Sequence, residues 1–518
     1  MKRSRRIALV IALASMTFSS AALAAPLGGK QDGTPVISPN VKLSSHVYDY
    51  IEKLDGLGYL TDMRIGAKPY NRLQIARWLV QIEGAMAREA AAPTYAQGMI
   101  AELRKEFSPE LALLQGSGSL PQVELKEVGL QYVHYKGESI DQNRDKSTTN
   151  STYQPLNINN NGYDYGKGSN GVLTLTAEGY LNRHTLFSVT PRVAYSSDDS
   201  YVSLESAYMK THINNLEILV GKNELWWGQG YRGSLAFTNN APPQTSLRLS
   251  AAKPVQAGGV FKFLGQVQPS FFYSVLDANR KDVPYPSLVG MRTDFTPSEN
   301  FTFALARTSI VGGKNRSLGG FNDYKNFLFA VNATTAADEK WNSIAGLDFR
   351  WRIPHMNGLQ VYGEVYGEDN TGNKYLPAPS KRFYVGGVYI PRLTNDGSWD
   401  LRLEGGKTDK YTYVHSQYTE GYSHLGHILG DAIGNRATRY YGQLTHYHQS
   451  GLQLGFHVEQ LKMNEDTSSL QKVNSYWLSA RKKVNDQLAI TASAGMAKLS
   501  GNETGTNYLM SLGMTHTF

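Results

Sequence analysis

Residues 221–243 carry the side chains of this sequence that best suit a carbohydrate ligand. Trp226 and Trp227 present flat apolar faces, on which the C–H face of a sugar ring can stack. Arg232, Asn239 and Asn240 supply hydrogen-bond donors beside those faces. The glycines between them let the backbone turn tightly, so the segment also fits a loop folded into a barrel lumen and pinned by buried tryptophans. The two interpretations are compatible with each other.

Catalytic and metal-binding patterns give no comparable signal. The sequence contains no Gly-x-Ser-x-Gly, no His-Glu-x2-His and no phosphate-binding glycine-rich loop. Acidic pairs at 198–199 and at 420 and 431 would suit a glycosidase only at a defined separation, and solvated loop charges are the favoured interpretation. Six histidines lie between residues 415 and 457, but their spacing does not match a zinc ligand set. We therefore expect no enzymatic activity, no metal and no cofactor.

Lysine and arginine residues gather in the long connections predicted between strands. Many surface polysaccharides are acidic, and arginine binds carboxylates bidentately, so these residues are candidates for polysaccharide contact. Lipopolysaccharide phosphates, or water alone, would satisfy the same side chains. The set comprises Arg232, Arg280, Lys281, Lys314, Arg316, Lys325, Lys374, Lys410, Arg436 and Arg439.

Composition excludes several classes of protein. At 518 residues the chain is long enough for two or three domains or for one large barrel. No stretch after the first thirty residues approaches the ~18 apolar residues of a membrane helix, which excludes a helical membrane protein. The 50 glycines and 32 tyrosines fit the tight turns and aromatic girdles of an outer-membrane barrel. The chain has no cysteine, which excludes disulfides and thiolate metal sites.

Residues 1–24 have the pattern of a secretory signal peptide. Basic residues stand at positions 2, 3, 5 and 6, an apolar core spans 7–14, and Ala-Leu-Ala at 22–24 forms a cleavage site. Without these four basic residues the formal charge falls from +8 to +4. So small a charge argues against a nucleic-acid partner and is compatible with a role at the cell surface.

A small helical region is predicted before the barrel. Residues 25–40 are predicted to be a flexible lead-in, and residues 41–117 a periplasmic bundle of three helices. Asn71 is expected to cap the second helix, and Pro109 to end the third. The stretch from Tyr48 to Leu79 faintly resembles an S-layer-homology module, which implies binding to a cell-wall polymer, although its usual acidic-glycine loop is missing. A structural bundle that caps the barrel is the favoured interpretation.

Residues 118–518 are predicted to form an all-β transmembrane barrel, because apolar and polar residues alternate from about Val123 onward. Short turns alternate with long connections, and the segments between them number about 18 antiparallel strands, an even number as closed bacterial barrels require. The loop of Trp226 is then the third external loop and that of His427 the seventh. Residues 321–332 are predicted to form a short helix able to plug the lumen, with a strand as the alternative. Phe518 ends the last strand as an aromatic signal for the barrel-assembly machinery.

Two motifs resemble a known family. The pattern Lys-x3-Trp-Trp-Gly-x-Gly-x2-Gly-Ser-Leu from Lys222, with Asn-Asn-Ala-x-Pro from Asn239, resembles the Wzi family of outer-membrane capsule-assembly proteins. A second segment is similar to the same family, with Tyr-x2-Gly-Tyr from Tyr418 and Gly-His-x-Leu-Gly-Asp-Ala from Gly426. The resemblance runs, more thinly, from about residue 40 to the C-terminus.

The resemblance implies an outer-membrane lectin that attaches and organises capsular or related exopolysaccharide at the cell surface. From residue type and position, the predicted polysaccharide-binding residues are Trp226, Trp227, Arg232, Asn239, Asn240, His427, Arg436 and Arg439. The competing class is an outer-membrane porin or polysaccharide export channel, because a barrel of this size is wide enough for an aqueous channel. A wall anchor that acts through the helical bundle is the third class.

Overall fold

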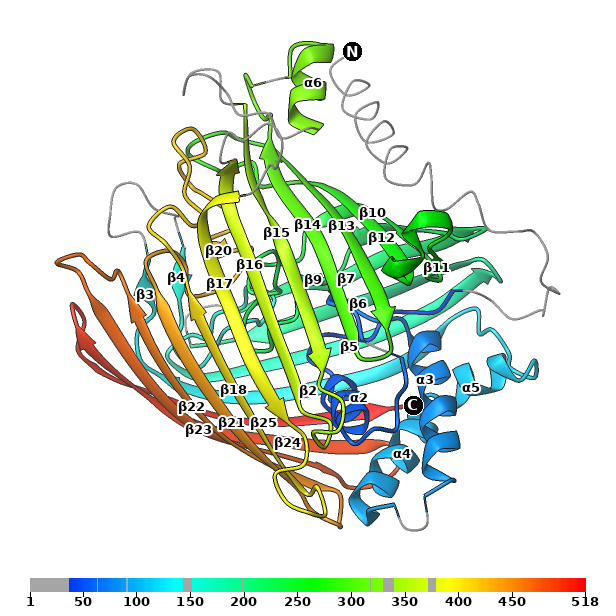
Figure 1. Cartoon of the computed structure of the whole chain (residues 1–518). Helices are drawn as coiled ribbons and strands as arrows, with labels where there is room; N and C mark the ends of the chain where they lie inside the picture. The colour runs from blue at the N-terminus through cyan, green and yellow to red at the C-terminus, as the bar shows by residue number, and fades with distance from the viewer. Residues whose placement is uncertain are drawn as a thin grey trace.

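The computed structural model describes residues 37–62, 64–89, 92–142, 151–197, 200–316, 318–328, 340–370 and 379–518 (Figure 1). The predicted signal peptide and most of the lead-in lie outside this part of the chain. So do residues 198–199, Lys374 and the end of the segment 321–332.

A closed ring of antiparallel strands forms because each long strand is hydrogen-bonded to the next and the last, β25, is bonded back to the first, β2. Val128 of β2 lies opposite His516 of β25 in this closing pair. The predicted all-β barrel and its count of 18 strands are thereby confirmed. The strands are β2 (Glu124–Lys136), β5 (Gly168–Asn182), β6 (Thr185–Tyr195), β7 (Ser200–Ile213), β8 (Leu216–Lys222), β10 (Thr245–Ala251), β12 (Gln266–Val275), β13 (Ser287–Ser298), β14 (Phe301–Val311), β15 (Trp341–Arg352), β16 (Gln360–Asn370), β17 (Pro379–Ile390), β18 (Trp399–Lys407), β21 (Thr438–Tyr447), β22 (Leu452–Met463), β23 (Gln471–Lys483), β24 (Leu488–Gly501) and β25 (Gly505–Thr517).

Strand periodicity determines which side chains face the membrane. Along β25, Met510, Leu512 and Met514 are exposed on the outer face, whereas Ser511 and Gly513 between them face the lumen. A closed ring leaves no unpaired strand edge, which is the condition for a sheet to span a bilayer. An even number of antiparallel strands is typical of bacterial outer membranes, so the protein is an outer-membrane β-barrel.

Four helices precede the barrel in the described part of the chain: α2 (Val47–Gly56), α3 (Arg72–Met86), α4 (Thr94–Glu106) and α5 (Ser108–Leu114). The predicted cap of α3 is confirmed, since Asn71 Oδ1 accepts a hydrogen bond from the backbone N of Gln74 at 2.8 Å. The third predicted helix is α4, which ends at Glu106 and so stops before Pro109 as expected. A fourth helix, α5, was not predicted; Pro109 lies in its first turn, where a missing N–H sacrifices no helical hydrogen bond. None of the described helices is long and apolar enough to cross a membrane.

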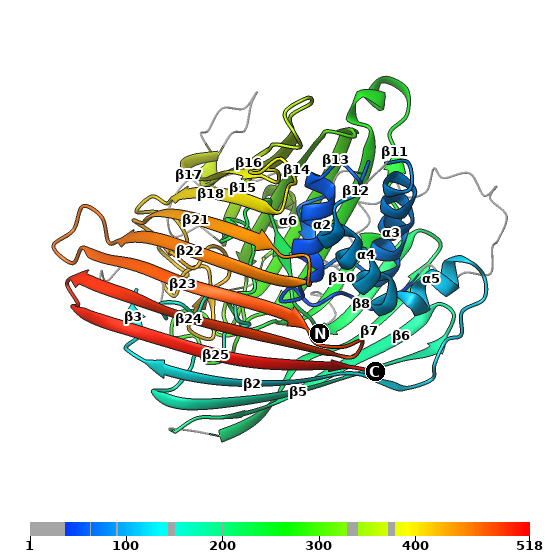
Figure 2. The same ribbon diagram turned by 90° about the horizontal axis from the view of Figure 1, so that it is seen from below.

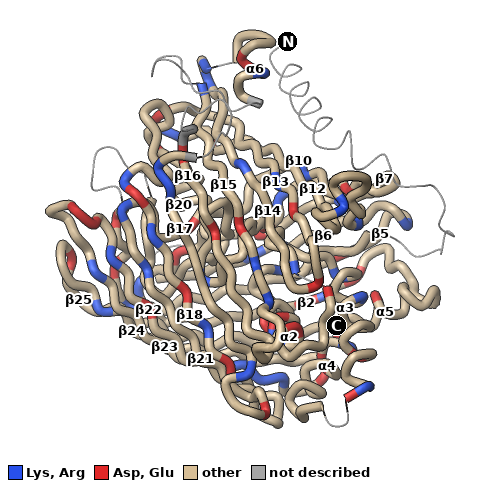
Figure 3. Tube along the Cα trace, in the orientation of Figure 1, with Lys and Arg blue, Asp and Glu red and all other residues tan. Residues whose placement is uncertain are grey.

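The helices lie at one end of the barrel, which we call the bundle end; the opposite end, with the long connections, is the loop end (Figure 1). Figure 2 shows α2 inside the ring of strands and α3, α4 and α5 across the bundle end. Buried Glu52 of α2 pairs with Arg350 of β15 at 2.9 Å and with Arg402 of β18 at 2.6 Å. Acidic and basic residues gather around α2 (Figure 3). Because buried charges are stable only when paired, these contacts fix the bundle to the barrel.

The helix predicted within residues 321–332 forms, as α6 (Phe321–Leu328), but it does not plug the lumen. Its buried Phe327 packs edge-on against Trp341, with ring centroids 5.6 Å apart, and the Phe327 carbonyl accepts from Arg307 Nη1 at 2.6 Å. Arg307 shares the outward face of β14 with exposed Leu305. The prediction of a plug here is wrong because the apolar side of α6 finds its partners on the outer wall.

Candidate functional site

Two long connections fold back into the lumen and meet there. They are the third, residues 223–244, and the seventh, residues 408–437; we call them together the plug. Thr238 donates its backbone N–H to Leu429 O at 2.8 Å. Tyr422 donates its hydroxyl to Ala236 O at 2.9 Å. Buried apolar side chains of both connections pack in one cluster with inward residues of β12–β17. Both family-like motifs therefore lie in the lumen.

Carboxylates on the inner wall hold the backbone of the plug. Glu364 of β16 accepts from the backbone N of Gly230 at 2.7 Å and of Leu235 at 2.8 Å. Glu404 of β18 accepts from the backbone N–H groups of residues 231–232, at 2.6 and 3.0 Å. An intramolecular hydrogen bond contributes roughly 0.5–1.5 kcal/mol net, so the four bonds together fasten the third connection to the wall.

The glycines of the first motif are required by close packing. A Cβ on Gly233 would lie 2.3 Å from the Asp431 carboxylate, and one on Gly230 would lie 1.9 Å from Gly233 O. Gly228 has a φ of +142°, which L side chains rarely adopt, and its Cβ would meet Ser234 Oγ at 2.0 Å. The motif therefore builds a tightly packed plug.

Three of the predicted binding residues make contacts within the plug or between the plug and the barrel wall. Trp227 is 2% exposed and packs against Phe272, with ring centroids 5.0 Å apart. Asn240 donates its side-chain amide to a carbonyl of the seventh connection at 3.1 Å. Arg439 pairs with Asp431 at 2.6 Å and is fully buried. These contacts are structural, and polysaccharide binding by these three residues stays a prediction.

Three others, Trp226, Arg232 and Asn239, line a chamber of about 930 Å³ on the bundle side of the plug. Its walls are the plug, the helical region and the inner faces of β22–β25, β2 and β5. Exposed rim residues, among them Asp486 and Phe518, belong to the lining, so the chamber opens at the bundle end.

Arg232 is fixed against an aromatic surface in the chamber. Its guanidinium carbon lies 5.6 Å from the ring centroid of Tyr441 and 4.9 Å from that of Trp477. Its Nε donates to Glu459 Oε2 at 2.7 Å. The two rings stack with centroids 5.9 Å apart and planes inclined by 26°. A stacked aromatic surface with an arginine on it provides the apolar face and the hydrogen-bond donors that a sugar ring requires.

Trp226 and Lys68 form the other notable part of the lining. They are register partners where the short strand β1 (Ala67–Lys68) pairs with β9 (Trp226–Trp227), and the ammonium of Lys68 lies 5.7 Å from the Trp226 ring. Trp226 is 6% exposed, and its indole Nε1 has no hydrogen-bond partner in the described part of the chain. Burial lowers the pKa of Lys68 to about 8, and Glu52 only partly offsets this effect.

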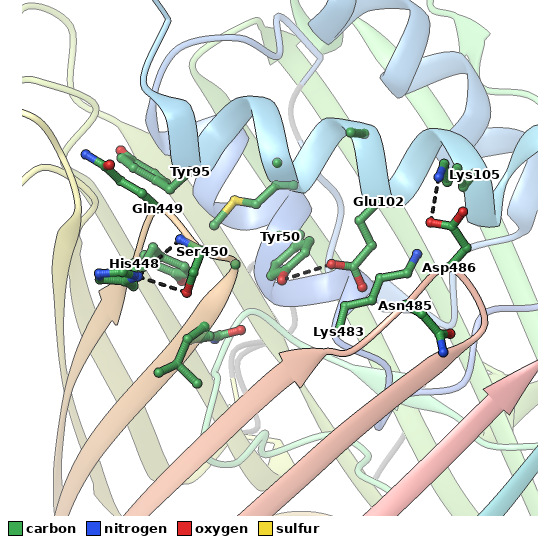
Figure 4. Close-up of a pocket in the computed structure, with 17 residues that line it drawn as sticks. Tyr50, Tyr95, Glu102, Lys105, His448, Gln449, Ser450, Lys483, Asn485 and Asp486 are labelled. Carbon is green, nitrogen blue, oxygen red and sulfur yellow. Dashed lines mark hydrogen bonds and ion pairs between the residues drawn. The ribbon is translucent and has the colours of Figure 1, made fainter.

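A smaller pocket of about 280 Å³ adjoins the chamber between α4 and the turns that follow β21 and β23 (Figure 4). Glu102, Lys105 and Lys483 line both cavities. Lys105 pairs with Asp486 at 2.5 Å, and the two side chains are 57% and 71% exposed. This ion pair therefore stands at the mouth shared by the two cavities.

The two remaining predicted residues, His427 and Arg436, are half-buried in the seventh connection. His427 Nε2 lies 3.7 Å from Asp164 Oδ2 in the first connection, and burial lowers the pKa of His427. The geometry thus does not bring them together with Trp226, Arg232 and the chamber.

An aromatic ring flanked by two cations lies at the loop end. Tyr411 is 41% exposed. The ammonium groups of Lys381 and Lys410 lie 4.3 and 4.8 Å from its ring centroid. This grouping can stack on a sugar and pair with its carboxylates.

The clustered histidines have separate partners. His446 stacks on Trp399 with ring centroids 4.4 Å apart, and His424 lies 3.3 Å from Asp277. Within the residues that the structure describes, no group of three or more His, Asp or Glu side chains is placed to hold a metal ion. That the protein needs no metal or cofactor stays a prediction.

Sequence reasoning missed three glutamates. Glu364 and Glu404 hold the backbone of the plug, and Glu459 holds the side chain of Arg232. A usable signal existed, because each stands inside an alternating strand at a position whose neighbours face outward. A buried acidic residue on the inner face of a barrel needs a donor, which comes either from the wall or from a segment folded into the lumen. Lys68 was missed because it lies outside both motifs.

Comparison with known proteins agrees with the fold and the motifs. The family model for the capsule assembly protein Wzi matches residues 140–504. A curated relative, described as an uncharacterized 55.8 kDa protein in the cps region of Klebsiella pneumoniae, is 29% identical over 196 residues. That match covers 37% of this chain and only 38% of the relative.

Among solved structures, one similar fold is Wzi from Escherichia coli, described as an outer-membrane protein involved in group 1 capsule assembly and as a carbohydrate-binding β-barrel. It matches with a TM-score of 0.70 at 18% identity, over 93% of this chain and 100% of that chain. Because the family model spans most of the sequence and both motifs lie within it, the chain belongs to the Wzi family of capsule assembly proteins.

Proposed function

We propose that this protein is a non-enzymatic outer-membrane lectin that attaches and organises capsular or related exopolysaccharide at the cell surface. The observation that supports this best is the plug, in which both family motifs fill the lumen and are hydrogen-bonded to the wall. A barrel filled in this way is a rigid support for a binding surface. The carbohydrate binding described for E. coli Wzi and the cps region named for the K. pneumoniae relative are consistent with the proposal.

The outer binding surface is the loop end around Tyr411. Its ring stacks on the C–H face of a sugar, and Lys381 and Lys410 pair with carboxylates of an acidic polymer. His427 and Arg436 contribute from the same connection. In this proposal Trp227, Asn240 and Arg439 act indirectly, by holding the plug on which that connection rests.

The competing function is a porin or an export channel for polysaccharide. It requires a water-filled path, and the plug opposes one because its apolar cluster bridges the lumen to β12–β17. Single-channel recording in a planar bilayer separates the two functions. We expect no steady large openings, and their appearance would contradict a plugged lectin.

Three further partners remain proposals. Lipopolysaccharide phosphates suit exposed cations at the loop end, and the exposed C-terminal Phe518 suits the barrel-assembly machinery. Binding to a cell-wall polymer through the helices has weaker support. Within the stretch that resembles an S-layer module, α2 lies inside the ring of strands and its Glu52 is used for attachment to the barrel.

The cellular test is the partition of surface polysaccharide between cells and medium in a deletion strain. Complementation compares wild type with Tyr411→Ala and with Phe321→Ala, a matched control because Phe321 is an exposed aromatic residue of α6. We expect polymer to be shed without the protein, and wild type and the control to restore attachment better than Tyr411→Ala. Polymer trapped inside the cell would indicate an export channel, and unchanged attachment in the deletion strain would refute the proposal.

A further inference from the structure

We infer that the chamber at the bundle end is a second saccharide site, which takes a carboxylated sugar unit. This inference rests on the proposed function for the ligand class, and it adds a second location and a charge requirement. The chamber volume of about 930 Å³ falls within the ~300–1,000 Å³ typical of small-molecule sites. The plug separates it from the loop-end surface, so it is reached from the other end of the barrel.

The charges around Lys68, rather than those of the lining as a whole, favour an acidic ligand, because three arginines, Arg64, Arg350 and Arg402, act on its ammonium beside the single carboxylate of Glu52. Eight lining residues are Lys or Arg and six are Asp or Glu. Six of the eight cations lie within ion-pair distance of a carboxylate of the chain. Lys68 and Lys483 have no such partner in the described part of the chain. Because a cation in a partly desolvated site is stabilised by an adjacent anion, a ligand carboxylate supplies what Lys68 lacks.

The indole of Trp226 points to the same ligand. Among the residues that the structure describes, none accepts a hydrogen bond from its buried Nε1, and buried donors normally have an acceptor. The β1–β9 pairing holds Trp226 beside Lys68. A sugar acid offers a carboxylate for the ammonium and a ring oxygen or hydroxyl for the indole. It thus satisfies both groups at once.

The other walls of the chamber provide contacts for the C–H face and the hydroxyl groups of a sugar. Tyr441 and Trp477 form a stacked aromatic surface, on which a C–H face packs. The walls from β24 and β25 carry short hydroxyl side chains, among them Ser493 and Thr515, which leave space and offer hydrogen bonds to ring hydroxyls. A phosphate ion shares the negative charge but uses neither wall.

Cysteine protection tests the site in the intact protein, because the native chain has no cysteine. Ser493→Cys and Thr515→Cys each place one thiol in the chamber, and Asn502→Cys places one at the exposed turn after β24. Purified full-length protein in detergent is labelled with a maleimide in the presence of a galacturonic acid tetrasaccharide, maltotetraose or inorganic phosphate. We expect the acidic tetrasaccharide alone to slow labelling at positions 493 and 515.

Three outcomes overturn the inference. Protection by maltotetraose at equal concentration removes the requirement for a carboxylate, and equal protection by phosphate reduces the chamber to a simple anion site. Absence of protection at both chamber positions removes the site altogether. That last result does not affect the proposed lectin function if the deletion strain still sheds its polymer. Failure of the chamber site can therefore be distinguished from failure of the proposed function.

Variants in the Ser493→Cys background identify the groups responsible. Lys68→Met is expected to raise the tetrasaccharide concentration for half-protection at least about ten-fold, since it removes the charge partner. Trp226→Phe keeps an aromatic face, removes only the indole N–H, and should weaken protection about three-fold or more. Lys472→Met, on an exposed residue of β23 outside the chamber, is the matched control. Equal protection in all three variants would contradict the assigned roles.

Discussion

Gly233 and Asp431 meet at the centre of the plug, so closely that a Cβ on the glycine would lie 2.3 Å from the carboxylate. One belongs to the third connection and the other to the seventh. Arg439 holds the same carboxylate from the wall, at 2.6 and 2.8 Å. The two family motifs are thus halves of one packed unit anchored on β21.

Gly233→Ala is expected to separate these halves. The added methyl group must displace Asp431, which breaks the buried ion pair with Arg439 and costs roughly 3–5 kcal/mol. Thermal unfolding in detergent and proteolysis of the plug measure the loss. Gly84→Ala is the matched control, because no atom of the described residues lies within 4 Å of a Cβ there and alanine favours the interior of α3 by about 1 kcal/mol. Equal behaviour of the two variants would refute the packing argument.

Glu364→Gln is expected to loosen the third connection without unfolding the barrel. The amide NH2 group of glutamine would face the backbone N–H groups of Gly230 and Leu235, so at least one of them loses its acceptor, at roughly 1–3 kcal/mol. Protease should then cut within residues 223–244, and brief channel openings should appear in a bilayer. Glu138→Gln serves as the control because Glu138 is 68% exposed in a surface ion pair. A plug as resistant as that of the wild type would contradict the role of Glu364.

Much of the fold was predictable, because alternation along a strand is a local signal. The last strand is predicted by its own alternation, with Met510, Leu512 and Met514 facing outward, and no knowledge of the neighbouring strands is needed. The position of α6 was not predictable by the same reasoning. The outer wall of a membrane barrel is itself apolar, so an apolar side chain such as Phe327 does not show on which side of the wall it packs.

The candidate site was predictable only in part. Both motifs were recognised, but Trp226 and Trp227 were treated as one stacking platform. They occupy β9, where successive side chains point to opposite faces, so Trp226 lines the chamber and Trp227 enters the apolar cluster. The wall glutamates join positions far apart in the chain. Such partners follow from strand register, which residue patterns do not define.

Glu52→Gln is expected to detach the helical region from the barrel. Glu52 is buried among three arginines, Arg64, Arg350 and Arg402. Arg64 keeps its pair with Asp55, but removal of the Glu52 charge leaves Arg350 and Arg402 without a carboxylate at ion-pair distance in the described part of the chain, at roughly 3–5 kcal/mol. Proteolysis between α2 and α5 and a lowered unfolding temperature would report it. Glu83→Gln is the matched control on α3, since its pair with Arg104 is largely exposed and contributes about 0–1 kcal/mol. Resistance of Glu52→Gln equal to that of the control would contradict the attachment.

Asp49 of α2 makes the stability of the folded protein depend on pH. Burial and the nearby Glu52 raise its pKa to about 6, against the opposing effects of Arg402 and of the hydrogen bond from Tyr231. Asp400 is the other charged group that acts on it, and it also raises the pKa. The value exceeds the ~3.9 of an unfolded aspartate, so the folded state binds the proton more tightly. Stability from this group is therefore fully present below pH ~4 and is lost as the pH rises through about 6.

Asp49→Asn should remove that loss, because the amide stays neutral at every pH. We expect the variant to be more stable than wild type at pH 7.5, by on the order of 1–3 kcal/mol, and nearly equal to it at pH 4. Asp62→Asn, at an exposed position before α3, should change stability at neither pH. Unfolding of both variants in detergent across this range decides the matter. An Asp49→Asn variant whose stability relative to wild type is the same at pH 4 and at pH 7.5 would show that Asp49 is ionised in the folded state without cost.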